Sequence, residues 1–170
     1  MSRPQANEYD PYYEHYVSLV PEDDIKSVLA AQPAELKALI GSVPETKGTY
    51  AYADGKWTIK QMLGHLIDGE RMFAYRIFRI SRGDETPIEG FEQDPYIENA
   101  NSNGRPFADL LTEFSLLREA NMIFFNNLKD DAWTRVGTAN QRQISVRALA
   151  WIMAGHIRHH TGVLNERYLT

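Results

Sequence analysis

The sequence predicts an all-α protein, and specifically a four-helix bundle. Four stretches of about 20 residues repeat apolar side chains with the period of an α-helix, and the segments between them contain no convincing strand pattern. Helices that each carry one apolar face bury those faces most economically against one another. We therefore expect a single domain over residues 1–170, with helices near 22–41, 58–80, 107–128 and 145–168.

Composition excludes several classes of function. The 170 residues carry a net charge of −5 and contain no run of basic side chains, which argues against nucleic acid as a partner. No run of ~18 apolar residues is present to span a membrane, and we see no apolar core of a secretory signal at the N-terminus. The absence of cysteine excludes disulfides, cysteine-ligated metals and a protein thiol nucleophile, and it fits a cytoplasmic location.

Local signals mark where the first two helices begin. The first helix follows Pro21 and opens with acidic residues, which favour the N-terminus of a helix. Pro33 should kink or split this helix near Gln32, because proline has no amide hydrogen to donate. Thr58 and Gln61 form the sequence signature of a capping box, so we expect the second helix to start near Thr58.

Two segments lie outside the predicted helices. Residues 1–20 form an arm with four tyrosines, which we expect to pack onto the body of the protein, with His15 at the surface or hydrogen-bonded. Residues 82–106 form an acidic connection that is unusually long for a compact domain. This connection is a crossover, a lid or a dimer contact, and we favour the crossover. Arg76 and Arg79 could hold an anionic substrate, but we favour ion pairs with the acidic connection.

The last predicted helix carries a pair of histidines. Ser145 is the expected N-cap of this helix, and His156 and His160 lie four residues apart on its core-facing side. An imidazole in an apolar core needs a partner, since leaving its polar atoms unmet costs about 1–3 kcal/mol. A divalent metal would partner both rings at once, whereas carboxylates would satisfy them without a metal. His159 could replace His160 in the pair, but it lies off the core-facing side and is expected to support the site or face solvent.

His65 of the second predicted helix is the natural third ligand. It lies about 10–12 Å from the start of its helix, and the midpoint of the pair formed by His156 and His160 lies about 15 Å from the end of the last helix. These depths match if the two helices are antiparallel, which gives the bundle an up-down-down-up order. The 82–106 connection can join the parallel helices that this order requires. Gly69 should leave room beside the His65 ring.

A site of three neutral imidazoles fits Zn²⁺, Ni²⁺, Fe²⁺ or Cu²⁺, with coordination positions left for water or substrate. The pair on the last helix is not a zincin motif, because Ile157 stands where that motif has its general-base glutamate. Asp68 and Glu70 are near His65 in the sequence, but we expect them to face solvent or to orient an imidazole ring. The sequence therefore shows no obvious general base.

Several stretches resemble known proteins. Three resemble the second helix of the DinB-like superfamily: Gly55–Thr58, Gly64–Asp68 and Ala74–Ile77. The stretch Ala154–His160 resembles the last helix of that superfamily, and Gly90–Asp94 with Trp133 resembles its YfiT-type branch. The resemblance implies an up-down-down-up four-helix bundle, often dimeric, that binds a divalent metal through His65, His156 and His160.

The resemblance also implies a class of function. Members of this superfamily include thiol-dependent S-transferases and isomerases and metal-dependent hydrolases. We therefore expect an enzyme whose divalent metal (zinc, nickel or iron) activates a low-molecular-weight thiol or water for reaction with a small-molecule substrate, and we favour the S-transferase. The alternatives are a metal-dependent hydrolase and a non-enzymatic, stress-associated metal-binding bundle. The tyrosine-rich arm leaves room for a homodimer contact.

Overall fold

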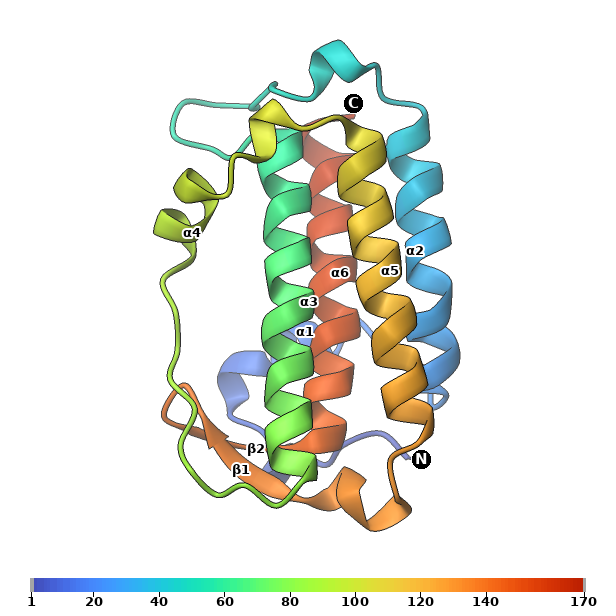
Figure 1. Cartoon of the computed structure of the whole chain (residues 1–170), viewed down its shortest axis with the longest axis vertical. Coiled ribbons are helices and arrows are strands. Elements are labelled where there is room, and N and C mark those ends of the chain that lie inside the picture. The colour runs from blue at the N-terminus through green and yellow to red at the C-terminus, as the bar shows by residue number, and fades with distance from the viewer. Residues whose placement is uncertain (1, 170) are drawn as a thin grey trace.

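The computed structural model describes residues 2–169, and four long helices form its body. These are α2 (Ile25–Gly41), α3 (Ile59–Ser81), α5 (Phe107–Asn126) and α6 (Val146–Arg167). In Figure 1, α2 and α6 run upward while α3 and α5 run downward, so the order along the chain is up-down-down-up. The predicted four-helix bundle is confirmed, and α3 and α6 are antiparallel neighbours.

Side-chain caps place the starts of the helices. Thr58 Oγ1 accepts a hydrogen bond from the Gln61 amide at 3.1 Å, and Gln61 Oε1 accepts one from the Thr58 amide at 2.9 Å. This is the predicted capping box, and it satisfies two amides that have no partner inside the helix. Ser145 Oγ caps α6 by accepting from the Ala148 amide at 3.0 Å. The first helix begins later than predicted because its N-cap is Asp24.

Of the two effects predicted for Pro33, a kink or a split, the split does not occur, because α2 runs through it without interruption. Its ring nitrogen cannot donate to the carbonyl of Leu29, four residues earlier, and that oxygen loses its helical partner. Arg118 of α5 supplies the missing donor, since its Nη1 lies 2.7 Å from Leu29 O and 2.8 Å from Gln32 Oε1. A long-range contact therefore compensates for the local defect, and the helix continues to Gly41.

The expectation that no strand is present was wrong. Strands β1 (Val136–Ala139) and β2 (Arg142–Ser145) form an antiparallel hairpin across the end of the bundle. Asn140 and Gln141 join the strands with φ of 50° and 62°, and positive φ at both positions is what a type I′ turn requires. Strands of four residues with mixed polarity are too short to show a period-two pattern, so packing against the bundle decides their conformation.

The acidic connection is a crossover, as favoured above, but it is not structureless. It contains α4 (Gln93–Asn99) and a 3₁₀ turn at Ser102–Gly104, and Ile88 pairs with Ala139 of β1. Figure 1 shows it climbing beside α3 from one end of the bundle to the other. Asp94 Oδ1 accepts from Trp57 Nε1 at 3.2 Å, which ties α4 to the start of α3.

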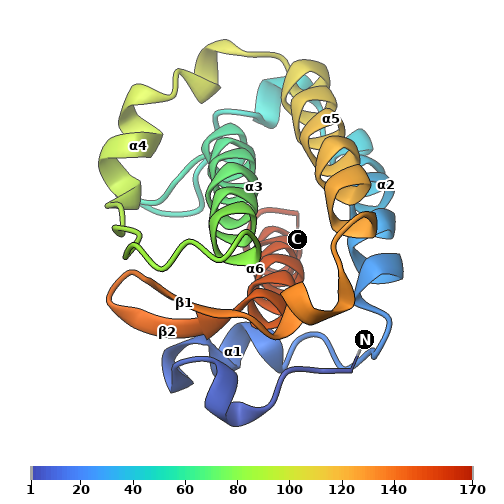
Figure 2. The ribbon, with the colours of Figure 1, turned by 60° about the horizontal axis from the view of Figure 1, so that its bottom comes forward.

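The N-terminal arm packs onto the body. It contains 3₁₀ turns at Ala6–Glu8 and Pro11–Tyr13 followed by α1 (Glu14–Val17), and Figure 2 shows α1 beside the hairpin and α6. Tyr9 and Tyr13 are buried, whereas His15 is exposed and lies 2.7 Å from the carbonyl of Tyr12. Gly155 permits this packing, because a Cβ there would lie 2.1 Å from the carbonyl oxygen of Tyr16.

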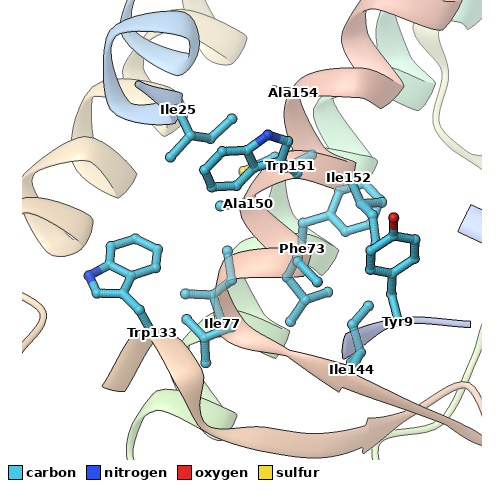
Figure 3. Packing of buried hydrophobic residues seen from close by; sticks show 14 of the residues in the cluster. Tyr9, Ile25, Phe73, Ile77, Trp133, Ile144, Ala150, Trp151, Ile152 and Ala154 are labelled. Carbon is cyan, nitrogen blue, oxygen red and sulfur yellow. The ribbon is translucent and has the colours of Figure 1, made fainter. Parts of the chain in front are cut away.

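Two apolar clusters fill the bundle, one toward each end. One cluster reaches Phe73 on α3 and Ala154 on α6, and Figure 3 shows its part around Trp133 and Trp151. The other includes Leu66 and Ile67, which flank His65 on α3, and Ile157, which follows His156 on α6, so it reaches the level of the histidines. None of the helices described within residues 2–169 is long and apolar enough to cross a membrane.

Candidate metal centre

Helices α3 and α6 bring three histidines together. The candidate ligand nitrogens of His65, His156 and His160 all lie within 4.8 Å of one another. The Nε2 atoms of His65 and His156 are 2.8 Å apart, and the centroids of the three rings are separated by 4.6–4.8 Å. The depths estimated from helix rise thus led to three residues that are neighbours in space.

Burial keeps the three imidazoles neutral. His65, His156 and His160 are only 4%, 5% and 9% exposed. Loss of solvent lowers the pKa of His65 to about 4, partly opposed by the Asp94 carboxylate, and lowers the pKa of His160 to about 2. The pKa of His156 also falls well below its usual value, through burial first and then through the neighbouring imidazoles. Neutral imidazole is the form that binds a metal ion.

The donor set fits a divalent metal. Nδ1 of His160 is buried and has no hydrogen-bond partner among residues 2–169, a costly state that a bound ion or water removes. Nitrogen ligands about 2.0–2.1 Å from a tetrahedral zinc ion lie roughly 3.3 Å apart, so a small opening of the His65–His156 pair accommodates an ion. Three imidazoles leave coordination positions for other ligands, which is the catalytic type of site.

Small and aromatic residues shape the surroundings of the histidines. A Cβ on Gly69 would lie 2.9 Å from Cε1 of His156, so this glycine lets the His156 ring lie against α3. We expected Gly69 to leave room beside His65; the ring that uses the space is that of His156. The Trp57 ring packs 4.8 Å from His65, and the Tyr16 ring packs 5.5 Å from His156, measured between centroids.

The expectation for Glu70 was wrong. Its carboxylate is buried and receives two hydrogen bonds from Arg118, at 2.8 and 2.7 Å, and a third from Asn121 at 2.8 Å. Five residues turn a helix by about 500°, so Glu70 points about 140° away from His65 and meets α5. Asp68 is partly exposed and lies 3.9 Å from Arg71. Neither carboxylate hydrogen-bonds to a histidine within the described part of the chain.

Asp94 is a functional candidate that sequence reasoning missed. Its carboxylate borders the same cavity as His160 and is close enough to raise the pKa of His65 against the effect of burial. Trp57 Nε1 donates to Oδ1 and leaves Oδ2 for other contacts. Asp94 is 29 residues from His65 in the sequence, and the Gly90–Asp94 resemblance carried no role for it. Only the path of the crossover brings it to the site.

The histidine cluster borders two cavities. One, of about 260 Å³, is lined by His65 and His156 together with residues of the arm, α3 and the crossover. The other, of about 350 Å³, is lined by His160, Trp57 and Asp94. His159 also lines this second cavity and is not part of the group of three.

Arg76 and Arg79 of α3 behave differently. Arg79 forms the expected ion pair with the connection, through Asp84, and also donates to the hydroxyl of Tyr75 at 2.9 Å. The corresponding expectation for Arg76 was wrong. Arg76 is 6% exposed, forms no ion pair with any residue in 2–169, and lines the cavity that contains His65.

Comparison with known proteins decides the family. A sequence profile of the DinB superfamily matches residues 29–164. The chain belongs to the DinB superfamily. Its relatives include "Putative metal-dependent hydrolase YfiT" of Bacillus subtilis, 31% identical over 113 residues, which are 66% of this chain and 60% of that protein. The aligned segment therefore spans less than two thirds of that relative. A "Putative metal-dependent hydrolase" of Bacillus pumilus is 23% identical over 81% of this chain and 79% of that protein.

Solved structures support the fold of this DinB-superfamily chain. The structure of YfiT from Bacillus subtilis superposes with a TM-score of 0.76, covering 96% of this chain and 89% of that one at 19% identity. The mycothiol-dependent maleylpyruvate isomerase superposes with a TM-score of 0.69, covering 86% and 61% at 14% identity. At these identities the likeness establishes the shared bundle topology.

Proposed function

We propose that this protein is a divalent-metal-dependent enzyme that transfers a low-molecular-weight thiol to a small electrophilic substrate. The observation that carries the proposal is the position of the three buried histidines between two separate cavities. A thiol transfer needs room for two organic molecules beside one metal ion, and the site offers it.

The chemistry divides between the ion and the chain. His65, His156 and His160 would hold the divalent ion, which would supply Lewis acidity that lowers the pKa of a thiol or water. Asp94 Oδ2 is the free carboxylate oxygen beside the cluster and would accept the proton of the nucleophile. Burial of the imidazoles excludes water from the cluster, which strengthens each of these electrostatic effects.

Atoms balance in the proposed transfer. The thiol sulfur forms a bond to an electrophilic carbon, the bond from that carbon to its leaving group breaks with its electron pair, and the thiol proton passes to Asp94 and then to solvent. The protein has no cysteine, so the thiol must come from solution. The cavity of about 350 Å³ next to Asp94 is the place for the thiol, and the cavity of about 260 Å³ is the place for the acceptor.

Hydrolysis is the second candidate. Its support is the same free carboxylate of Asp94 beside the histidines, together with two relatives named as metal-dependent hydrolases. In this case water takes the place of the thiol, and the second cavity holds part of a single substrate.

Two measurements test the proposal. Untagged protein purified without chelators should contain about one divalent metal ion per chain by elemental analysis. The loaded protein should then catalyse the reaction of cysteine or glutathione with 1-chloro-2,4-dinitrobenzene, followed through its coloured product, and should lose this activity after metal removal.

The outcomes separate the candidates. Turnover of p-nitrophenyl acetate with no thiol-dependent reaction would replace transfer by hydrolysis. A bound metal with no turnover of either kind would favour a non-enzymatic metal-binding bundle. Every metal-dependent function would be overturned if the wild-type protein binds no metal and the His65→Ala variant is as stable as wild type.

A further inference from the structure

Arg76 is a buried cation with no ion-pair partner among residues 2–169. Its side chain is 6% exposed, and Nε is fully buried with no hydrogen-bond acceptor among residues 2–169. No carboxylate in that range comes within ion-pair distance, and burial lowers the pKa of the guanidinium. An arginine cannot escape this cost by losing its proton. A buried charge of this kind is normally paired, so an anion from outside the chain is the missing partner.

Arg76 faces the same cavity as the histidines. Eleven residues separate it from His65, which is about 1100° of helix and so within about 20° of the same direction. Gly69 lies between them on this side of α3, and the cavity of about 260 Å³ is lined by all three residues. At about 30 Å³ for each water molecule, the cavity has room for about nine waters, the size of a small organic anion.

The other groups around the cavity do not neutralise Arg76. Tyr12, Tyr13 and Tyr16 of the arm line it, and their uncharged hydroxyls cannot neutralise a guanidinium as a carboxylate would. Glu92 of the crossover also lines it, but the glutamate is exposed and forms no ion pair with Arg76. Arg79, three residues along α3, is already paired with Asp84 outside the cavity. The positive charge on Arg76 is therefore available to a ligand.

We propose that Arg76 binds an oxyanion of the substrate, a carboxylate or a phosphoryl group, in the cavity that His65 and His156 also line. The guanidinium presents donors in a fork that matches either oxyanion. The orientation of the other end of the substrate toward the histidines rests on the proposed function. The anion site at Arg76 does not require it.

Isothermal titration of the full-length protein with sodium adipate and with inorganic phosphate tests this site. Each probe is titrated into metal-loaded and metal-stripped protein. Wild type should bind at least one probe, which identifies the oxyanion class, and Arg76→Met should weaken that binding by tenfold or more. Arg79→Met is the matched control because its partner lies outside the cavity, and its affinity should stay within about twofold of wild type.

Thermal melting gives a second reading on the same proteins. The bound probe should raise the melting temperature of wild type and not that of Arg76→Met. Without probe, Arg76→Met should melt at or above the wild-type temperature, because a buried unpaired charge has been removed. Arg76→Lys keeps the charge without the fork and should bind more weakly than wild type.

Defined results overturn the site. It fails if wild type binds neither probe, or if Arg76→Met binds as tightly as wild type. Binding that depends on Arg76 in a protein that proves to hold no metal would support the anion site while rejecting the proposed metal-dependent function. If wild type binds no anion and its metal-dependent turnover is unaffected by Arg76→Met, the metal-dependent function is kept and the anion site is rejected.

Discussion

His65 and His156 face each other across α3 and α6 with their Nε2 atoms 2.8 Å apart. The two residues are 91 positions apart in the sequence, and both belong to helices whose starts are set by side-chain caps. Their closeness places two ring nitrogens within hydrogen-bond distance of each other in a buried environment. This contact, together with His160, is the basis for expecting a metal ion at this point.

Removal of one histidine should remove the metal. His65→Ala leaves two imidazoles and should reduce the metal content from about one ion per chain to below a tenth, measured by elemental analysis after gel filtration. His159→Ala is the matched control, since His159 lines a neighbouring cavity without belonging to the three. Equal metal content in the two variants would contradict the ligand assignment.

The metal-free protein should lose stability as the pH falls below about 6.5. Burial lowers the pKa of His65 to about 4 and of His160 to about 2, so these rings stay neutral in the folded state while the unfolded chain binds protons near 6.5. The unfolded state then holds more protons, and the free energy of unfolding decreases. At pH 5.5 the loss is about 1.4 kcal/mol for each buried histidine.

Urea unfolding at pH 7.5 and 5.5 measures this effect. The variant His65→Ala should show a smaller loss than wild type, whereas His15→Ala, changed at an exposed position, should show the same loss. An unfolding free energy that does not change over this range would mean that the histidines are not buried in the neutral form.

Gly69→Ala should weaken metal binding without unfolding the protein. The added methyl group would lie 2.9 Å from Cε1 of His156 and must displace that ring. We expect a loss of metal affinity of at least tenfold, comparable to the loss of a residue that orients a ligand, measured by competition with a chromogenic chelator. Gly162→Ala on α6 is the control: a Cβ there meets nothing within 4 Å, so affinity should not change.

The pair formed by Glu70 and Arg118 should show strong coupling in a double-mutant cycle. Glu70→Leu leaves the Arg118 charge buried, which should cost about 3–5 kcal/mol of unfolding free energy. The double variant with Arg118→Met removes both charges and should lie closer to wild type, although the Leu29 carbonyl then loses its donor. Additive effects in urea unfolding would show that the pair is not coupled.

Asp94→Asn should lower turnover while the metal stays bound. The amide keeps an oxygen that can accept from Trp57 Nε1, but it cannot take a proton from the nucleophile. We expect a 10²-fold or larger fall in kcat at unchanged metal content. Glu98→Gln, at an exposed position of the same helix α4, is the control, because Glu98 lines neither cavity. Unchanged turnover in Asp94→Asn would remove Asp94 from the proton transfer.

Several features could be predicted from the sequence because their causes are local. The capping box of Thr58 and Gln61 and the four-residue spacing of His156 and His160 need only one turn of helix, and helical rise then related their depth to His65. The crossover role of residues 82–106 followed from the same depth argument. The expected homodimer, the identity of the metal and the cytoplasmic location stay predictions.

Other features depend on residues that meet only after folding. Arg118 donates a hydrogen bond to the Leu29 carbonyl, 89 positions away, and pairs with Glu70, 48 positions away. Neither contact can be predicted from the pattern of neighbouring residues. The hairpin was missed because four-residue strands are shorter than the period analysis can resolve. Asp94 lies on α4 of the crossover, and the sequence shows no helical periodicity of apolar residues that would have predicted this short helix.

The sequence by itself determined the four helices, their order and the three histidines, because helix periodicity, caps and rise are properties of neighbouring residues. Only the tertiary structure decided which charges are paired. Glu70 and Arg79 have partners, while Arg76 is enclosed in the cavity that His65 and His156 also line and has no partner among residues 2–169. The physical reason is that pairing depends on distances between helices and on access to solvent, which the order of residues along one helix does not specify.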